Sequence, residues 1–277
     1  MNLAELQTFL AVVDQRSLVR ASEQLNVTQS TVTARIDSLE ARLGQKLLER
    51  NKSGTELTSA GFKFIRYAEV MTQLWRQAQY EVGLPSGFTS ICNVGCYVDL
   101  WEGLCDGFLD RVRSLEPAVA AAIWPGDQHN IDRWLETGLV DIAFCYSPQS
   151  RGVFAAREIG VDTFVQVAFD PPPGSERSGG YVYVDYGIQF RREHAVAFAG
   201  AAPPAVTVAS AGWAVDHLLR WGGTGYLPRR RLGDLPKDRT RIVEAAPVLR
   251  QAVFLVENTA TTAHWPWFAP LADTLSV

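Results

Sequence analysis

Side chains that could hydrogen-bond to nucleic-acid bases are concentrated in residues 28–35, where a helix-like segment begins. The Gln amide can bond to adenine through both of its polar atoms, and Thr methyl groups can touch thymine methyls. The N-terminus of a helix also favours a phosphate group. The alternative is that these residues form only the solvated face of a short helix. The candidate residues are Thr28, Gln29, Ser30, Thr31, Thr33 and Arg35.

The surrounding pattern predicts a helix-turn-helix followed by a small hairpin. Ser17 can cap one helix and Thr28 the next, and the apolar positions after Thr28 recur at helical spacing. In such a motif the N-terminal part of the second helix enters the major groove. Residues 47–57 indicate two short strands around a turn-rich tip, which would reach the neighbouring DNA backbone or the minor groove. The basic residues expected to contact the backbone are Arg20, Arg50 and Lys52.

A long helical pattern follows, from Thr58 to about Val82. At 1.5 Å per residue this helix would be ~37 Å long. A lone helix with a continuous apolar stripe needs a partner, often a second copy of itself. The dimerisation candidates along the stripe are Phe62, Ile65, Ala68, Met71, Trp75 and Ala78.

The composition is that of a globular chain with an uneven charge. The 277 residues are 47% hydrophobic and carry a net charge of −4, which by itself discourages nucleic-acid binding. Residues 1–66, however, hold nine basic and seven acidic residues, a net charge of +2, so the remainder carries −6. No apolar run is long enough to cross a membrane, and the N-terminus does not have the pattern of a signal peptide. We therefore expect a cytoplasmic protein with no membrane partner.

The order of elements predicts two domains, the first helical and the second α/β. Strand-like and helix-like segments alternate after residue 88, which favours parallel α/β layers. The predicted divisions are a DNA-binding domain at 1–60, a linker helix at 58–82, a hinge at 83–87 and a C-terminal domain at 88–277.

The first domain resembles the LysR-type transcriptional regulators. The segments that carry the resemblance are Leu6–Val13, Ser17–Leu25, Thr28–Glu40, Leu47–Arg50 and Leu57–Gly61. This resemblance implies a winged helix-turn-helix, a linker helix that pairs two subunits, and a two-lobed effector domain like a periplasmic binding protein. It also implies a homodimer or homotetramer on double-stranded DNA, with RNA polymerase and a small-molecule effector as further partners.

The C-terminal domain is less similar to the family. Leu135, Gly138 and Asp141 match the family's approach to its third strand, and Gly222–Pro228 resembles its glycine-rich turn. Residues 99–102 and 185–194 look similar to a short-chain subgroup that includes a repressor of flagellar operons.

Ligands of open α/β sheets bind beyond the carboxyl ends of the strands. Ser210 would precede a helix there and could help to hold an anion. In the family, the turn after the first strand of the first lobe often carries Ser or Thr, which helps to bind a carboxylate. Here this turn is Gly95-Cys96-Tyr97 and has neither. Asp185 would repel an acid and attract an amine. The alternatives are that Ser210 is only a helix cap and that Asp185 lies in a surface turn. The effector-binding candidates are Gly95, Cys96, Tyr97, Cys145, Tyr146, Asp185, Ser210 and Ala211.

The cysteines and histidines leave a thiol or metal site undecided, and the absence of catalytic motifs argues against an enzyme. Cys96 and Cys145 would end neighbouring strands, which allows a thiol switch or a soft-metal site, although buried inert thiols are the commoner case. The four histidines have no metal-ligand spacing, so we expect no metal and no cofactor. No nucleotide-binding or nucleophile motif is present, so we expect no enzyme. The alternative function is a ligand-independent repressor whose C-terminal domain serves oligomerisation or protein contacts; a polar cleft would favour the sensor.

Overall fold

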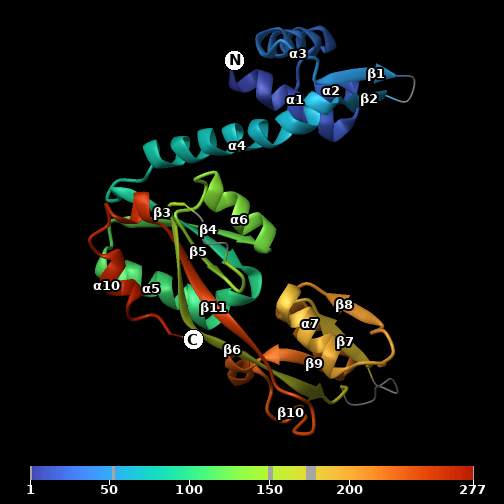
Figure 1. The fold of residues 1–277 in the computed structure, drawn as a ribbon, viewed down its shortest axis with the longest axis vertical. Coiled ribbons are helices and arrows are strands. Elements are labelled where there is room, and N and C mark those ends of the chain that lie inside the picture. The colour runs from blue at the N-terminus through green and yellow to red at the C-terminus, as the bar shows by residue number, and fades with distance from the viewer. Residues whose placement is uncertain (1, 52–53, 149–151, 173–178, 277) are drawn as a thin grey trace. The chain divides into compact units, whose positions relative to one another are not determined.

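The computed structural model describes residues 2–51, 54–148, 152–172 and 179–276, which fall into two compact units, Met1–Leu84 and Pro85–Val277 (Figure 1). In the part of the chain that is described, no helix is long and apolar enough to cross a membrane.

The first unit is a helix-turn-helix with a hairpin and a long helix. Asn2, Ser17, Thr28 and Thr58 cap its four helices with their side chains, because each accepts a hydrogen bond from a backbone N–H of the first turn. The elements are α1 (Leu3–Gln15), α2 (Leu18–Gln24), α3 (Gln29–Leu43), β1 (Leu48–Asn51), β2 (Gly54–Leu57) and α4 (Ser59–Val82).

A buried carboxylate joins α3 to the hairpin. Oε1 of Glu40 accepts hydrogen bonds from the backbone N–H groups of Leu47 (2.8 Å) and Leu48 (3.2 Å), and Oε2 lies 2.6 Å from Nζ of Lys46. The hairpin packs closely against the start of α4, where a Cβ at Gly61 would lie 2.2 Å from the carbonyl oxygen of Leu47. The start of the β1–β2 hairpin is therefore held in a fixed position relative to α3.

The second unit is a mixed sheet of two lobes joined by two long antiparallel strands. The sheet order among the described residues is β4-β3-β5-β11-β6-β9-β7-β8, with β10 paired to β6. Its strands are β3 (Ser90–Tyr97), β4 (Val119–Gly126), β5 (Ile142–Cys145), β6 (Phe154–Phe169), β7 (Tyr181–Val184), β8 (Val206–Val208), β9 (Gly223–Pro228), β10 (Thr240–Ile242) and β11 (Leu249–Asn258). Its helices are α5 (Asp106–Leu115), α6 (Gln128–Glu136), α7 (Ile188–Ala197), α8 (Ala211–Trp221), α9 (Thr259–Thr262) and α10 (Phe268–Ala272).

Each lobe is built around parallel strands. In the first lobe β3 pairs in parallel with β4 and β5, as expected for its first and third strands, and α5 and α6 accompany them. In the second lobe β7 pairs in parallel with β8 and β9, and α7 and α8 belong to this part. The strands β6 and β11 run through both lobes (Figure 1). Their register shifts between Val253 and Phe254, which marks a bulge where the lobes meet.

The helical segment from Leu100 to Val112 is interrupted. Gly103 has φ +79° and Glu102 an extended ψ, so the chain kinks and the regular helix α5 begins only at Asp106. A left-handed backbone at Gly103 costs little because glycine has no Cβ.

Polar contacts across the lobes involve the residues at this kink. Oδ1 of Asp99, which follows β3, accepts a hydrogen bond of 2.7 Å from the backbone N–H of Ala211 at the start of α8. The guanidinium of Arg230, which follows β9, donates to the carbonyl oxygens of Asp99 and Glu102 and to the carboxylate of Asp162. These contacts connect the first lobe to the second independently of the shared strands.

Asp99 is an unusual carboxylate because it is 1% exposed and its Oδ2 has no hydrogen-bond partner among the described residues. Burial raises the pKa of Asp99 to about 6, although the hydrogen bond from Ala211 and the charge of Arg230 act in the opposite direction. The ionised form is therefore less stable in the folded chain than in the unfolded chain.

Asp99 should make stability depend on pH. Its pKa is higher in the folded chain, so its stabilising contribution is complete below the ordinary carboxyl pKa and is lost as pH rises through about 6. Asp99→Asn keeps the Oδ1 acceptor for Ala211 but removes the titration. Between pH 4 and pH 7 the unfolding free energy of the native chain should fall by about 2–3 kcal/mol relative to this variant.

Urea unfolding followed by circular dichroism at several pH values measures this difference. The exposed Asp238→Asn is the matched control and should leave the pH dependence unchanged. Parallel curves for the native chain and Asp99→Asn would contradict the assignment.

Candidate functional site

The N-terminal end of α3 presents an exposed polar surface. Thr28, Gln29 and Ser30 are exposed, and Thr31 and Thr33 are half-buried. The Thr28 hydroxyl lies 2.9 Å from the hydroxyl of Ser30 and 2.8 Å from that of Thr31, and it caps the helix through the N–H of Thr31. These hydroxyls and the Gln29 amide can therefore meet bases or phosphates without disturbing the core.

Arg35 lies differently from its sequence expectation. It is half-buried, and its Nη1 donates a 3.3 Å hydrogen bond to the hydroxyl of Thr8, which is fully buried on α1. Arg35 directly precedes Ile36, a residue of the buried stripe of α3. Its guanidinium is therefore engaged with α1 in this structure.

The other backbone-contact candidates are placed in part. Arg20 is exposed on α2, and Arg50 lies in β1. Lys52 falls outside the described residues. The second strand of the hairpin is held to the turn after α1, because the N–H of Thr55 donates to the carbonyl oxygen of Arg16 at 3.0 Å.

The six dimerisation candidates on α4 do not share one exposed face. Ala68 is fully buried in the core of its own unit, and Ile65 and Met71 pack against that core. These three side chains stabilise the helix-turn-helix rather than face a partner. Phe62 (67% exposed) and Trp75 (50%) are accessible, as is Ala78. A step of three residues turns a helix by about 300°, so each such step places the next candidate about 60° further around α4. The six candidates therefore do not lie on one face.

A narrower apolar strip remains exposed on α4. Its members lie within an arc of about 100° when each residue turns the helix by about 100°. Such a strip on an exposed helix is typical of a helix that pairs with another. The strip consists of Tyr67, Leu74, Trp75, Ala78 and Val82.

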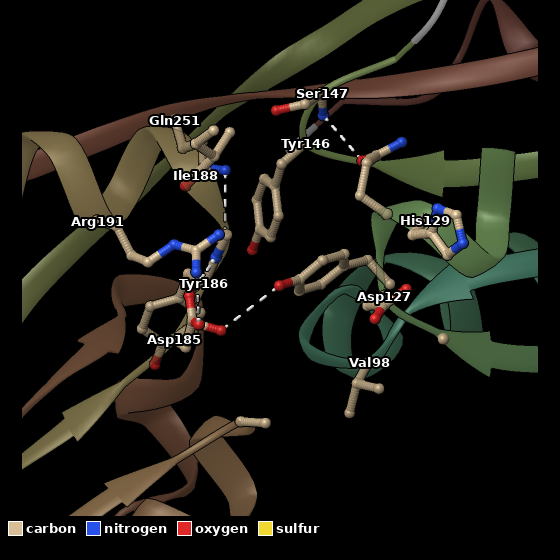
Figure 2. A pocket seen from close by; sticks show the side chains of 15 residues that line it. Val98, Asp127, His129, Tyr146, Ser147, Asp185, Tyr186, Ile188, Arg191 and Gln251 are labelled. Carbon is tan, nitrogen blue, oxygen red and sulfur yellow. Dashed lines mark hydrogen bonds and ion pairs between the residues drawn. The ribbon is translucent and has the colours of Figure 1, made fainter.

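A cavity of about 530 Å³ lies between the two lobes of the second unit (Figure 2). Of the effector-binding candidates, Tyr97, Tyr146 and Asp185 line it. Cys96 and Ser210 line a separate cavity of about 380 Å³ beside Trp101. Gly95, Cys145 and Ala211 line neither. The other residues around the larger cavity are Val98, Gly126, Asp127, Gln128, His129, Ser147, Tyr186, Gly187, Ile188, Arg191, Ala209 and Gln251.

Contacts across this cavity join its two sides. Tyr97 of the first lobe donates its hydroxyl to the carbonyl oxygen of Asp185 of the second lobe at 3.4 Å. The Asp185 carboxylate accepts from the N–H of Gly187 at 3.0 Å and lies 3.6 Å from Nη1 of Arg191. Asp185 therefore lies in the wall of this cavity and bridges to its neighbours there.

The anion site expected at Ser210 and Ala211 is filled by the chain itself. The Ser210 hydroxyl accepts from the N–H of Gly212 at 3.1 Å, and Asp99 accepts from the N–H of Ala211. The expectation of an open anion site there is wrong, because a buried carboxylate already satisfies the helix N-terminus.

Several cavity residues were missed from the sequence. Asp127, Gln128 and His129 follow β4, whose carboxyl end could have been included with those of the other strands. Gln251 lies on β11 and Arg191 on α7, two elements that the local pattern did not indicate.

The cysteines have the environment of buried thiols. All four are buried and unpaired by disulfides, and burial raises the pKa of Cys145 to about 12. This favours inert thiols over a thiol switch, because the thiolate is the reactive form. Among the described residues, no cluster of three or more His, Cys, Asp or Glu could hold a metal ion.

Comparison with known proteins supports the resemblance. Residues 3–62 match the family described as the bacterial regulatory helix-turn-helix protein, lysR family. The HTH-type transcriptional regulator HdfR of Salmonella typhimurium LT2 is 27% identical over 232 residues, which are 82% of each chain. HdfR of Salmonella newport matches equally.

Solved structures show the same fold over nearly the whole chain. The LysR family transcriptional regulator CbnR has a TM-score of 0.70 at 16% identity, with 99% of this chain and 97% of that chain covered. CbnR in complex with its target DNA has a TM-score of 0.68 at 16% identity and covers 99% and 96%. The chain therefore carries a LysR-family helix-turn-helix at residues 3–62, has the fold of a solved LysR family regulator, and is similar to transcriptional regulators over most of its length.

Proposed function

We propose that this regulator reads DNA with the N-terminal end of α3, pairs with a second copy through α4, and changes transcription when a small molecule occupies the cavity between its lobes. The cavity carries the ligand part of the proposal, because both lobes contribute polar residues to its wall. A cavity of this size, with polar side chains from both lobes in a largely apolar wall, favours a sensor over a repressor that needs no ligand. The regulator works on chromosomal DNA in the cytoplasm and catalyses no reaction, and RNA polymerase is its further partner.

Within α3 we assign base contacts to Gln29, Ser30 and Thr33. Gln29 and Ser30 are exposed at the end of the helix that enters the groove, and Thr33 follows one turn later. Arg35 is left to orient α3, because its guanidinium bonds to Thr8. Thr28, Thr31, Arg20 and the basic residues of the wing contact phosphates, which position the domain without reading sequence.

Gln29→Ala should weaken binding to the specific site by about 1–3 kcal/mol, because it removes a side chain that can bond to adenine with two atoms. The measurement is a gel-shift titration on DNA that the native chain selects from a random pool. Gln79→Ala, an exposed change on α4, is the matched control and should bind normally. An unchanged affinity for Gln29→Ala would remove Gln29 from the recognition surface.

Trp75→Glu should convert the oligomer to smaller species, because it places a charge in the exposed strip of α4. Sedimentation velocity measures the change. Tyr80→Glu is the control: Tyr80 is 70% exposed but lies about 140° around the helix from Trp75. Should Trp75→Glu sediment like the native chain, the main interface lies elsewhere.

Ala209→Trp should abolish the ligand response, because Ala209 is exposed on the cavity wall and an indole would fill the space. The small-molecule fraction of a cell extract should raise the melting temperature of the native full chain but not of this variant. Ala201→Trp, outside the cavity, should respond like the native chain. No shift for the native chain, or an equal shift for Ala209→Trp, contradicts a ligand in this cavity.

A further inference from the structure

Two carboxylates, those of Asp127 and Asp185, line the cavity together with one guanidinium, that of Arg191, and the imidazole of His129. The pair between Asp185 and Arg191 is a weak one, since the 3.6 Å contact involves an Arg side chain that is 56% exposed. Burial raises the pKa of Tyr97, and the charges of Asp99, Asp185 and Asp127 raise it further. Negative potential therefore prevails at this wall.

The two helices that begin at the cavity wall, α6 and α7, each have a carboxylate beside the N-terminus, although no side chain caps the first turn of α7. At the start of α6, Oδ1 of Asp127 accepts from the N–H of Asn130 at 2.8 Å. At the start of α7, Oδ1 of Asp185 accepts from the N–H of Gly187 at 3.0 Å. A carboxylate ligand would have to displace these groups and would meet their charge.

The aromatic residues of the wall offer ring faces more than free hydroxyls. The Tyr146 hydroxyl donates to Asp162 at 2.8 Å, and the Tyr186 hydroxyl donates to the carbonyl oxygen of Tyr226 at 2.9 Å. The rings of Tyr97 and Tyr146 meet edge to face, with centroids 5.1 Å apart. Figure 2 shows Asp185 and Arg191 on one side of the cavity and Asp127 and His129 on the other. Such rings suit an apolar body and attract a cation at their faces.

Gln251 supplies an independent sign that a hydrogen-bond donor is missing. It lines the cavity and is 2% exposed, and its Nε2 donates to the carbonyl oxygen of Tyr186 at 3.3 Å. Its Oε1 is buried and has no partner within the described residues. Buried acceptors are normally satisfied in folded proteins. A ligand N–H would satisfy this one.

We propose that the cavity takes an organic cation, a small primary amine with an apolar or aromatic body, and that Asp185 holds its ammonium group while Gln251 accepts one of its hydrogens. This inference rests on the ligand response proposed for the regulator and names the ligand's chemical class. Asp185 selects for the positive charge, the tyrosine rings contact the body, and Arg191 competes with the ligand for Asp185.

Calorimetric titration of the full chain with matched probes tests the class. Benzylamine is compared with benzoate, and 2-phenylethylamine with 3-phenylpropionate, because each pair shares a body and differs in charge. The amines should bind, and each acid should bind about tenfold more weakly or not at all.

Three variants test whether the amines bind to the residues of the cavity wall. Asp185→Asn keeps the Oδ1 acceptor for Gly187 and should lower amine affinity about tenfold, since a charge-assisted hydrogen bond is lost. Arg191→Ala removes the competing cation and should raise amine affinity. Asp238→Asn, exposed and outside the cavity, changes the net charge equally and should change nothing.

Three results overturn the proposal: acids that bind as tightly as the amines, amine binding that Asp185→Asn leaves unchanged, or no amine binding up to about 10 mM. The ligand response itself is judged separately. Acid binding that Ala209→Trp abolishes keeps a ligand-sensing cavity and rejects the amine. If neither the acids nor the amines bind and the cell fraction causes no shift in melting temperature, both proposals fail.

Discussion

The arrangement of the second unit depends on one buried carboxylate. Asp99 ends the first strand of the first lobe and caps the helix α8 of the second, and Arg230 returns from the second lobe to the backbone around Asp99. The strands β6 and β11 connect the lobes but carry a bulge where they cross between them. The strands alone therefore permit a change of angle, and the Asp99 contacts set the spacing at which the cavity walls face each other.

The contacts of Asp99 and Arg230 between the lobes also limit which changes a ligand could cause. A ligand shifts an equilibrium only by its difference in affinity for two states, so it must contact groups whose separation changes. Tyr97 and Asp185 are such groups, because they belong to different lobes and touch through a single 3.4 Å hydrogen bond. A ligand held by Asp185 would replace or strengthen this weak contact, while the buried contacts of Asp99 and Arg230 resist separation.

The sequence predicted best those features whose contacts join residues close together in the chain. The caps at Ser17 and Thr28, and the apolar spacing after Thr28, involve residues within one or two helical turns, and the helix-turn-helix was predicted from them. The contacts of the second unit join distant residues: Asp99 and Ala211 are 112 positions apart. No local pattern distinguishes Asp99 from a surface acid, so the filled anion site could not be foreseen. The surroundings of Ala68 and Arg35 could not be foreseen for the same reason, because their contacts lie in the core of the unit and on α1.

The basic residues of the first unit differ in whether their side chains are engaged within the protein. Its basic residues do not all face DNA: Lys46 bonds to Glu40 at 2.6 Å, Arg42 lies 3.9 Å from Glu5, and Arg35 bonds to Thr8. Phosphate contacts supply the sequence-independent part of DNA affinity. With a net charge of only +2 in residues 1–66, and part of the positive charge engaged internally, one subunit has little of this affinity. Binding must then depend on base contacts and on two linked subunits engaging two sites at once, which raises the effective concentration of the second domain. In the function proposed for this chain, the exposed strip of α4 is therefore as necessary to recognition as the exposed end of α3.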